Sequence, residues 1–385
     1  PTQRQEPYCG FEQGPIRPPS EANSLLIRVS RNCPWNKCTF CSLYKETKFS
    51  MRPLDHVLRD IDAIRFYVDS IEKTRKAGKQ ITQSELMVLA PEAGKPDLPA
   101  MHAASSFIAS GMESIFIQDG NSLILSPEKI IQILQHLKVS FPKVKRVTSY
   151  ARSQTISKIS DDHLKQMAEA GLNRIHIGME SGSDAVLTMV KKGADKATHI
   201  LAGQKVKKAG IQLSEYVMPG LGGKLLSHEN AVETADTLNQ INPDFIRLRT
   251  LALASGAPLT EQYREGNFDK MGEVDTAREL LTWLEHLSGI TSTIRSDHVL
   301  NLFPEIDGKL PEDKEIMMQP LQDFLQLAPY EQMLFCIGKR THRLHSMVDL
   351  QDPIKRDYII DVCERLGANV DNFDDVIDAL MKRFI

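Results

Sequence analysis

The chain lacks three features that would each point to a particular class of protein. No apolar run approaches the ~20 residues that a membrane-spanning helix needs, so we expect no membrane partner. Basic residues are not in excess, because 47 lysines and arginines stand against 50 acidic residues for a formal charge of -3. Domains that bind nucleic acid usually carry a basic face, so a nucleic-acid partner is not expected. The opening PTQRQEPYCGFEQG resembles neither a secretion signal nor a basic presequence, which predicts a cytoplasmic protein.

Cysteine is scarce and unevenly placed. Three of the six cysteines, Cys33, Cys38 and Cys41, stand close together in RNCPWNKCTFCSLYK, whereas Cys9, Cys336 and Cys363 are scattered. A disulfide framework is not expected in a chain of 385 residues that lacks a secretory signal. Thiolates are the soft ligands of iron–sulfur clusters and of zinc, so the trio predicts a metal site. Three ligands would leave one iron of a four-iron cluster open to another molecule.

Short β-rich runs alternate with amphipathic helical patterns from about residue 25 to residue 300. Strands are expected at 24–30, 114–119, 145–151, 174–180, 211–218, 244–250 and 291–297. Helices are expected near 53–76, 127–139, 160–170, 196–209, 228–240 and 273–288. Ser126, Ser160 and Ser227 are the predicted helix starts, and Gly171 and Gly210 the predicted helix ends.

Repeated β–α units of this length imply parallel strands joined by right-handed crossovers. The predicted fold class is therefore α/β, a partial (β/α)6-type barrel with a small C-terminal helical extension. The alternative is a doubly wound open sheet, but no Gly-rich phosphate loop follows the first strand. The predicted parts are an N-terminal extension (1–23), the barrel (24–300, with an insertion at about 77–110) and a C-terminal helical cap (301–385).

The two-residue period of the strands places polar side chains on one face. If the aliphatic faces meet the outer helices, the interior of the barrel receives Arg28, His176, Glu180, Glu215, Arg247 and Arg249. So polar an interior suits a ligand chamber, and a buried charge network is the alternative. In a β/α barrel the chemistry lies at the C-terminal ends of the strands.

The cysteine loop, placed directly after the strand at 24–30, resembles that of the radical S-adenosylmethionine (radical SAM) superfamily. In that family the loop holds a [4Fe–4S] cluster, and S-adenosylmethionine (SAM) chelates the open iron. The resemblance implies that Cys33, Cys38 and Cys41 are the cluster ligands and that Phe40 fills the usual aromatic or apolar position before the last cysteine. It also implies reductive cleavage of SAM to a 5′-deoxyadenosyl radical. One departure is that four residues, rather than three, separate Cys33 from Cys38.

Other motifs extend the resemblance along the chain. GMESGSD (178–184) is similar to the fourth-strand motif of the branch that includes methylthiotransferases and anaerobic coproporphyrinogen oxidases, which implies that Glu180 binds the SAM ribose, with Ser181 beside it. MPGLGG (218–223) resembles the turn that lies against the adenine, which assigns Met218 and Gly220 to that surface. The expected cofactor-binding set is completed by Gln118, Asp119 and Gly120, which replace the usual Gly-Gly-Glu, and by Arg152, Arg249 and one of Lys191 and Lys192.

Tyr150, Asp297 and His298 are the candidates that would face the substrate, with ordinary packing as the alternative. The expected partners are a small-molecule substrate and an electron donor such as flavodoxin or ferredoxin. A tRNA-modifying or protein-modifying radical SAM enzyme is the main alternative.

Three non-enzymatic or accessory uses of the cysteines also stay open. A zinc site could be completed by a histidine such as His56, although no second cysteine or histidine pair is present. A redox pair of Cys38 and Cys41 does not suit a barrel pattern. A second cluster on Cys9, Cys336 and Cys363 would need long-range assembly.

Overall fold

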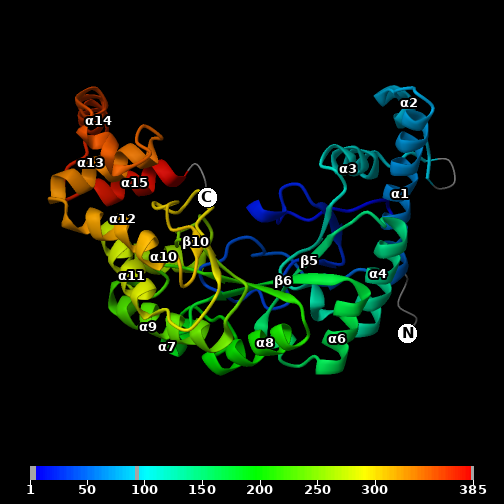
Figure 1. Cartoon of the computed structure of the whole chain (residues 1–385), viewed down its shortest axis with the longest axis horizontal. Coiled ribbons are helices and arrows are strands. Elements are labelled where there is room, and N and C mark those ends of the chain that lie inside the picture. The colour runs from blue at the N-terminus through cyan, green and yellow to red at the C-terminus, as the bar shows by residue number, and fades with distance from the viewer. Residues whose placement is uncertain (1–5, 92–94, 383–385) are drawn as a thin grey trace. The chain divides into compact units, whose positions relative to one another are not determined.

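The computed structural model describes residues 6–91 and 95–382 of the chain. The chain divides into two compact units. Unit 1 comprises Pro1–Trp35, Glu46–Ile177 and Leu201–Leu213, and unit 2 comprises Asn36–Lys45, Gly178–Ile200 and Ser214–Ile385. Figure 1 labels most of their helices and some of their strands. The predicted boundaries at residues 23 and 300 stay predictions.

Unit 1 is built on parallel strands in the order β1 (Leu25–Arg28), β4 (Ser114–Gln118), β5 (Arg146–Ala151) and the first part of β6 (Leu172–Glu180). Ile27, Ile115 and Ile117 are fully buried, as expected of parallel strands covered on both faces. The helices of this unit are α1 (Leu54–Lys76), α2 (Gln83–Met87), α3 (Leu98–Ala109), α4 (Pro127–Ser140), α5 (Ser153–Ile156) and α6 (Asp161–Ala170). β2 (Ser30–Arg31) and β3 (Ser50–Met51) form a short antiparallel pair. In the sequence, β2 precedes the cysteine loop and β3 follows it.

Unit 2 continues the β–α alternation. β7 (Gln212–Val217), β8 (Phe245–Leu248) and β9 (Thr293–Arg295) are parallel, and β10 (Gly308–Lys309) is antiparallel to β9. The helices among them are α7 (Asp184–Met189), α9 (Gly223–Ile241), α10 (Pro258–Arg264) and α11 (Glu273–His286), and α8 (Lys196–Lys208) is shared between the two units. The C-terminal region is helical, with α12 (Lys314–Gln326), α13 (Pro329–Arg340), α14 (Pro353–Leu366) and α15 (Phe373–Met381).

The predicted α/β class with a helical C-terminal region is therefore confirmed. Ser160 is the N-cap of α6, where its Oγ accepts a hydrogen bond from the His163 N–H, and Gly171 ends the same helix at φ +115°. The predicted helix start at Ser227 is wrong, because α9 begins at Gly223. Short helices α7 and α10 are additional to the prediction. In the described part of the chain no helix is long and apolar enough to cross a membrane.

Candidate functional site

The GMESGSD motif lies in unit 2 at the end of β6, where the backbone turns sharply. Glu180 has φ +68°, a conformation that is uncommon outside glycine, and its carbonyl accepts a hydrogen bond of 2.8 Å from the Met218 N–H. The Glu180 Oε1 atom accepts a hydrogen bond of 3.1 Å from Lys192 Nζ. A Cβ atom at position 178 would lie only 2.4 Å from that oxygen, so Gly178 is needed for the carboxylate to take this position.

The second half of the motif packs against α9. The Ser181 hydroxyl donates to Asn230 Oδ1 at 2.6 Å, and the Gly182 N–H donates to Thr234 Oγ1 at 2.8 Å. A Cβ atom on Gly182 would lie 2.4 Å from the Glu233 carbonyl oxygen, which is closer than real Cβ atoms approach backbone. The composition of the motif therefore follows from close packing at Gly178 and Gly182 and from the hydrogen bond that Ser181 donates.

A buried glutamate on α11 connects this motif to the Gly-rich turn. Glu279 Oε1 accepts hydrogen bonds from Asn230 Nδ2 at 2.9 Å and from the Gly220 N–H at 2.7 Å. Since Asn230 also accepts from Ser181, a continuous set of hydrogen bonds runs from the motif to the turn. Burial raises the pKa of Glu279 to about 7, although the donors from Gly220, Ser227 and Asn230 oppose the rise.

Glu279 and Asn230 were not predicted as site residues from the sequence. A signal was present, because Glu279 lies three residues after Thr276 and four before Trp283 on the buried stripe of α11. An acidic residue at such a position usually has a partner or a function. The identity of the partner depends on the turn at Gly220, which is distant in the sequence.

Glu215 of β7 is a second buried acid in unit 2. Its side chain is fully buried, and within the described residues neither carboxyl oxygen has a hydrogen-bond partner. Burial raises its pKa well above the ordinary value; Lys192 opposes the shift and Glu180 adds to it. Burial therefore favours the neutral form of the Glu215 carboxyl group, and that form can donate one hydrogen bond to a ligand.

The loop that carries Cys38 and Cys41 is tied to the same unit. The Thr39 N–H donates to the Val190 carbonyl at 2.9 Å, and the Thr39 carbonyl accepts from the Leu259 N–H at 2.8 Å. Phe40 packs against the buried cluster of Val186, Val190, Met218, Leu221, Leu251, Leu259 and Phe268. The loop between the two cysteines is thus anchored to α7, to α10 and to the Gly-rich turn.

Asn36 offers a physical account of the unusual spacing between Cys33 and Cys38. It has φ +45°, a conformation that asparagine tolerates better than most residues. Its Nδ2 atom donates to the Tyr44 carbonyl at 2.5 Å, and its own carbonyl accepts from Lys45 Nζ at 2.9 Å. The extra residue is absorbed in a left-handed turn that closes the loop from Asn36 to Lys45.

The predicted substrate-side residues Asp297 and His298 follow β9. Asp297 accepts a hydrogen bond of 3.0 Å from Arg247, a buried residue of β8. His298 Nδ1 accepts from the Leu300 N–H at 3.2 Å, which leaves the ring proton on Nε2. Burial, with the nearby charge of Arg249, lowers the pKa of His298 to about 4, and Asp297 opposes the shift. His298 is therefore neutral at pH 7.

The predicted acceptors after β4 lie in unit 1, where they already have partners. The side chain of Gln118 is fully buried; it accepts from the Gly14 N–H at 2.9 Å and donates to the Gly14 and Ile16 carbonyls at 3.1 and 2.8 Å. Asp119, at φ +73°, pairs with Arg28 Nε at 2.6 Å. Gln118 therefore holds the segment around Gly14 in place, and Gly120 follows in the turn.

Three other candidate residues of unit 1, Tyr150, Arg152 and His56, lie next to aromatic rings. The Tyr150 ring lies 5.2 Å from that of Phe116 in a T-shaped arrangement, and the Arg152 guanidinium lies 5.0 Å from the centre of the Trp35 ring. His56, the proposed fourth zinc ligand, packs edge-on against Tyr8 at 5.4 Å. Cys33 is partly exposed.

Part of the chain is similar in sequence to a known protein family. Residues 100–235 match the sequence model of the Radical SAM superfamily, a stretch that includes β4 to β7 and the GMESGSD motif. Over these residues the chain is therefore similar to the radical SAM superfamily, as its cysteine loop and the GMESGSD motif predict. Its named relatives include enzymes, which supports an enzymatic role for this chain.

Three similar proteins illustrate the range of the superfamily. The tRNA uridine(34) acetyltransferase of Methanocaldococcus infernus is 22% identical over 285 residues, which are 71% of this chain and 51% of that protein. The 4′-phospho-dehydrooxetanocin synthase of Priestia megaterium is 27% identical over 64% of this chain and 29% of that protein. Coproporphyrinogen III oxidase (HemN) from Escherichia coli, a solved radical SAM enzyme, aligns with a TM-score of 0.44 and 14% identity over 68% of this chain and 52% of that chain. The chain thus spans about half the length of the first of these relatives.

Radical SAM enzymes use a [4Fe–4S] cluster and SAM, and the donor chemistry of this chain fits both. Cys33, Cys38 and Cys41 are partly exposed thiols. Cys336 and Cys363 are buried, and burial raises the pKa of Cys336 well above its ordinary range and that of Cys363 to about 11. Cys9 is exposed as well, but it stands 24 residues before the trio in the sequence.

The unsatisfied oxygens of Glu215 provide a second sign that a polar ligand belongs in unit 2. Among residues 6–91 and 95–382, no three His, Cys, Asp or Glu side chains lie close enough together to hold a metal ion. Cys33 belongs to unit 1, whereas Cys38 and Cys41 belong to unit 2. The roles of the individual site residues stay predictions.

Proposed function

We propose that this chain reductively cleaves SAM at a [4Fe–4S] cluster held by Cys33, Cys38 and Cys41, and that it abstracts hydrogen from a small-molecule substrate. The observation that carries the proposal is the position of Glu180, whose carboxylate is held by Lys192 at 3.1 Å and whose backbone carbonyl accepts from the Met218 N–H. When bound, the cluster supplies the electron that splits SAM into methionine and a 5′-deoxyadenosyl radical.

The residues of the chain bind and orient the cofactor. The Glu180 carboxylate would accept hydrogen bonds from the ribose hydroxyls, and its position depends on the space beside Gly178. Glu279 fixes the Gly220 N–H, and hence the turn that would lie against the adenine. Glu215, in the neutral form that burial favours, can donate to an anionic or carbonyl oxygen without adding charge to the site.

A small-molecule substrate is supported by a cavity and by the charge of the chain. The cavity, in unit 2, has a volume of about 570 Å³, within the usual range for small-ligand pockets. The formal net charge of -3 does not favour a polyanion. The cytoplasmic location and an electron donor such as flavodoxin or ferredoxin remain part of this proposal.

Modification of tRNA is the second candidate function. Two relatives are named tRNA uridine(34) acetyltransferase, and each matches 71% of this chain at 21–22% identity. The matched stretch makes up only half of those proteins, so their remaining parts have no counterpart in the alignment. The similarity favours a tRNA substrate, whereas the charge and the cavity favour a small one.

The proposal predicts SAM cleavage by the anaerobically reconstituted chain. We expect about four irons per chain and, with dithionite, formation of 5′-deoxyadenosine and methionine measured by mass spectrometry. The Cys38→Ala variant should lose both the iron and the cleavage. The Glu180→Ala variant should keep the iron but bind SAM about tenfold more weakly or worse, because it loses a charge-assisted hydrogen-bond acceptor.

The Cys9→Ser variant is the matched control, because Cys9 is an exposed thiol outside the trio. It should keep the wild-type iron content and SAM affinity. Stoichiometric zinc in place of iron, together with no SAM cleavage by the wild-type chain, would overturn the proposal.

A further inference from the structure

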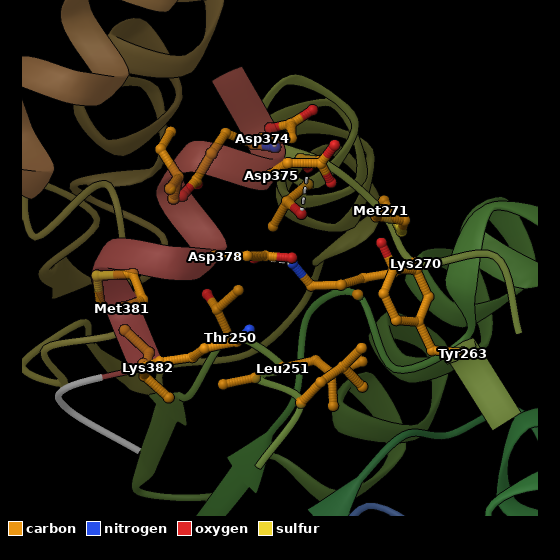
Figure 2. Close-up of a pocket in the computed structure, with 18 of the residues that line it drawn as sticks. Thr250, Leu251, Tyr263, Lys270, Met271, Asp374, Asp375, Asp378, Met381 and Lys382 are labelled. Carbon is orange, nitrogen blue, oxygen red and sulfur yellow. Dashed lines mark hydrogen bonds and ion pairs between the residues drawn. The ribbon is translucent and has the colours of Figure 1, made fainter. Parts of the chain in front are cut away.

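Unit 2 contains a cavity of about 570 Å³ whose walls come from separate elements. Figure 2 shows residues from the segment after β8, from the loop before α11 and from the C-terminal helix α15 around it. Apolar side chains such as Leu251, Ile377 and Met381 share these walls with charged ones. A cavity of this size and mixed lining suits a small amphiphilic molecule.

The cavity begins where β7 and β8 end. Gly220, whose N–H is held by Glu279, forms part of its wall, so the cavity adjoins the turn assigned to SAM. Thr250 is another wall residue, and Asn301 Oδ1 fixes it by accepting from the Thr250 N–H at 3.0 Å and from its hydroxyl at 3.1 Å. In parallel β/α folds, ligands that react lie at these strand ends.

Most of the charged groups in the walls are already paired. Lys270 pairs with Asp378, and Arg340 donates to Glu273 Oε1 at 2.6 and 2.8 Å. The Asp374 carboxylate accepts from the Glu273 N–H at 2.9 Å. Figure 2 shows the Lys270–Asp378 pair crossing the cavity from one wall to the other. The opposite charges within each pair neutralise one another, and the contacts hold α15 against the loop before α11.

Two charged wall residues are left over, and they have opposite signs. Within the described residues neither Asp375 nor Lys382 makes an ion pair or a side-chain hydrogen bond, and both are exposed. They lie seven residues apart at the C-terminal helix, a rise of about 10 Å along the helix axis. Ile377 and Met381 stand between them in the wall. The wall therefore presents an acid, an apolar stretch and a base in succession.

We propose that this cavity is the substrate chamber and that it takes a zwitterionic small molecule. An ammonium group of the substrate would face Asp375, a carboxylate would face Lys382, and an apolar part would cover Ile377, Met381 and Leu251. The inference rests on the proposed function, because only a SAM-cleaving site gives the adjoining chamber a reaction to serve. The balance of charge in the walls argues against a phosphate backbone as the occupant.

The test uses the tripeptide Ala-Leu-Ala, whose charged termini are about 10 Å apart when the chain is extended. Its binding to the reconstituted, SAM-loaded protein is measured by calorimetry, beside the N-acetylated and the C-amidated forms. We expect each blocked form to bind about tenfold more weakly than the free tripeptide. The Asp375→Asn variant should remove the advantage of the free amino terminus, and Lys382→Met that of the free carboxylate.

Matched controls are Asp371→Asn and Lys309→Met, which replace exposed residues outside the walls and should bind the tripeptide like the wild type. SAM affinity should be unchanged in all four variants. If SAM is cleaved but the tripeptide does not bind, or if blocking its termini has no effect, the chamber proposal is wrong while the proposed function stands. Binding of tRNA that is lost in Lys382→Met would overturn it as well. If SAM is not cleaved, the proposed function fails first.

Discussion

At the residue scale, the buried acids of unit 2 differ in what surrounds them. Glu215 has no hydrogen-bond partner in the described residues, whereas Oε1 of Glu279 accepts from Gly220 and from Asn230 and so ties them together. Glu215 therefore has unused capacity toward a ligand, and Glu279 has a positioning role. The two acids differ because Oε1 of Glu279 meets two donors, whereas neither carboxyl oxygen of Glu215 meets one.

Glu279 predicts a pH dependence of stability. Its pKa is about 7 in the folded chain against an ordinary value of 4.5, so the folded state holds the proton more tightly. The free energy of unfolding should fall as the pH rises from about 4.5 to about 7, by up to about 3 kcal/mol, and then level off. The Glu279→Gln variant keeps an acceptor for Gly220 and should lose this decline.

The measurement is urea unfolding of both proteins at pH 5 and pH 8. The charged residues that line the neighbouring surface hollow, Lys224, His228, Asp275 and Arg278, are common to both proteins and cancel in the difference. Equal pH slopes for the two proteins would refute the assignment. A pH-dependent SAM affinity that disappears in Glu279→Gln would show that protonation of Glu279 affects the turn at Gly220.

The sequence predicted some of these residues and not others. Glu180 was predicted because its motif is local, and Glu215 because strand alternation is local. Glu279 was missed because its role arises from Asn230 and Gly220, which lie 49 and 59 residues away in the sequence. Local patterns do not encode which distant donors meet at a buried acid.

At the element scale, the GMESGSD motif acts as a close-packed joint between β6 and α9. The absence of a side chain at Gly182 lets the two backbones approach, and Ser183 then begins α7 by accepting from the Val186 N–H. The helix and strand order was predictable from hydrophobic periods. The start of α9 was not, because its first turn holds Gly222 and Gly223 and is stabilised by the Asp269 carbonyl, which accepts from the Lys224 N–H.

Gly182→Ala tests this joint. The added methyl group would meet the Glu233 carbonyl and the Thr234 Cα atom at 2.4 and 2.8 Å, so we expect a loss of about 3 kcal/mol in the free energy of unfolding and a weaker affinity for SAM. Gly171→Ala is the control, because it has a positive φ and open space around it. It should lose about 1–2 kcal/mol and keep its SAM affinity. Equal SAM affinities in the two variants would speak against the joint.

At the scale of the whole molecule, charge bears on the choice between a small substrate and tRNA. The chain has a formal net charge of -3, whereas non-specific binding to nucleic acid depends on phosphate contacts by basic residues. We expect no retention of bulk tRNA in a filter-binding assay at about 150 mM salt and protein concentrations of about 1 μM. Tight retention with a steep salt dependence would favour the tRNA alternative over the small molecule.

The left-handed backbone conformation of Glu180 lowers the stability of the fold, but it belongs to a residue whose carboxylate has a proposed function. A residue with φ +68° is strained unless it is glycine or asparagine, and the Met218 hydrogen bond and the Lys192 pair maintain it here. Replacement by glycine would relieve the backbone and remove the carboxylate together. A laboratory selection for thermostability alone would therefore favour glycine at position 180. The resulting proteins would be more stable, but they would lack the carboxylate that is proposed to bind SAM.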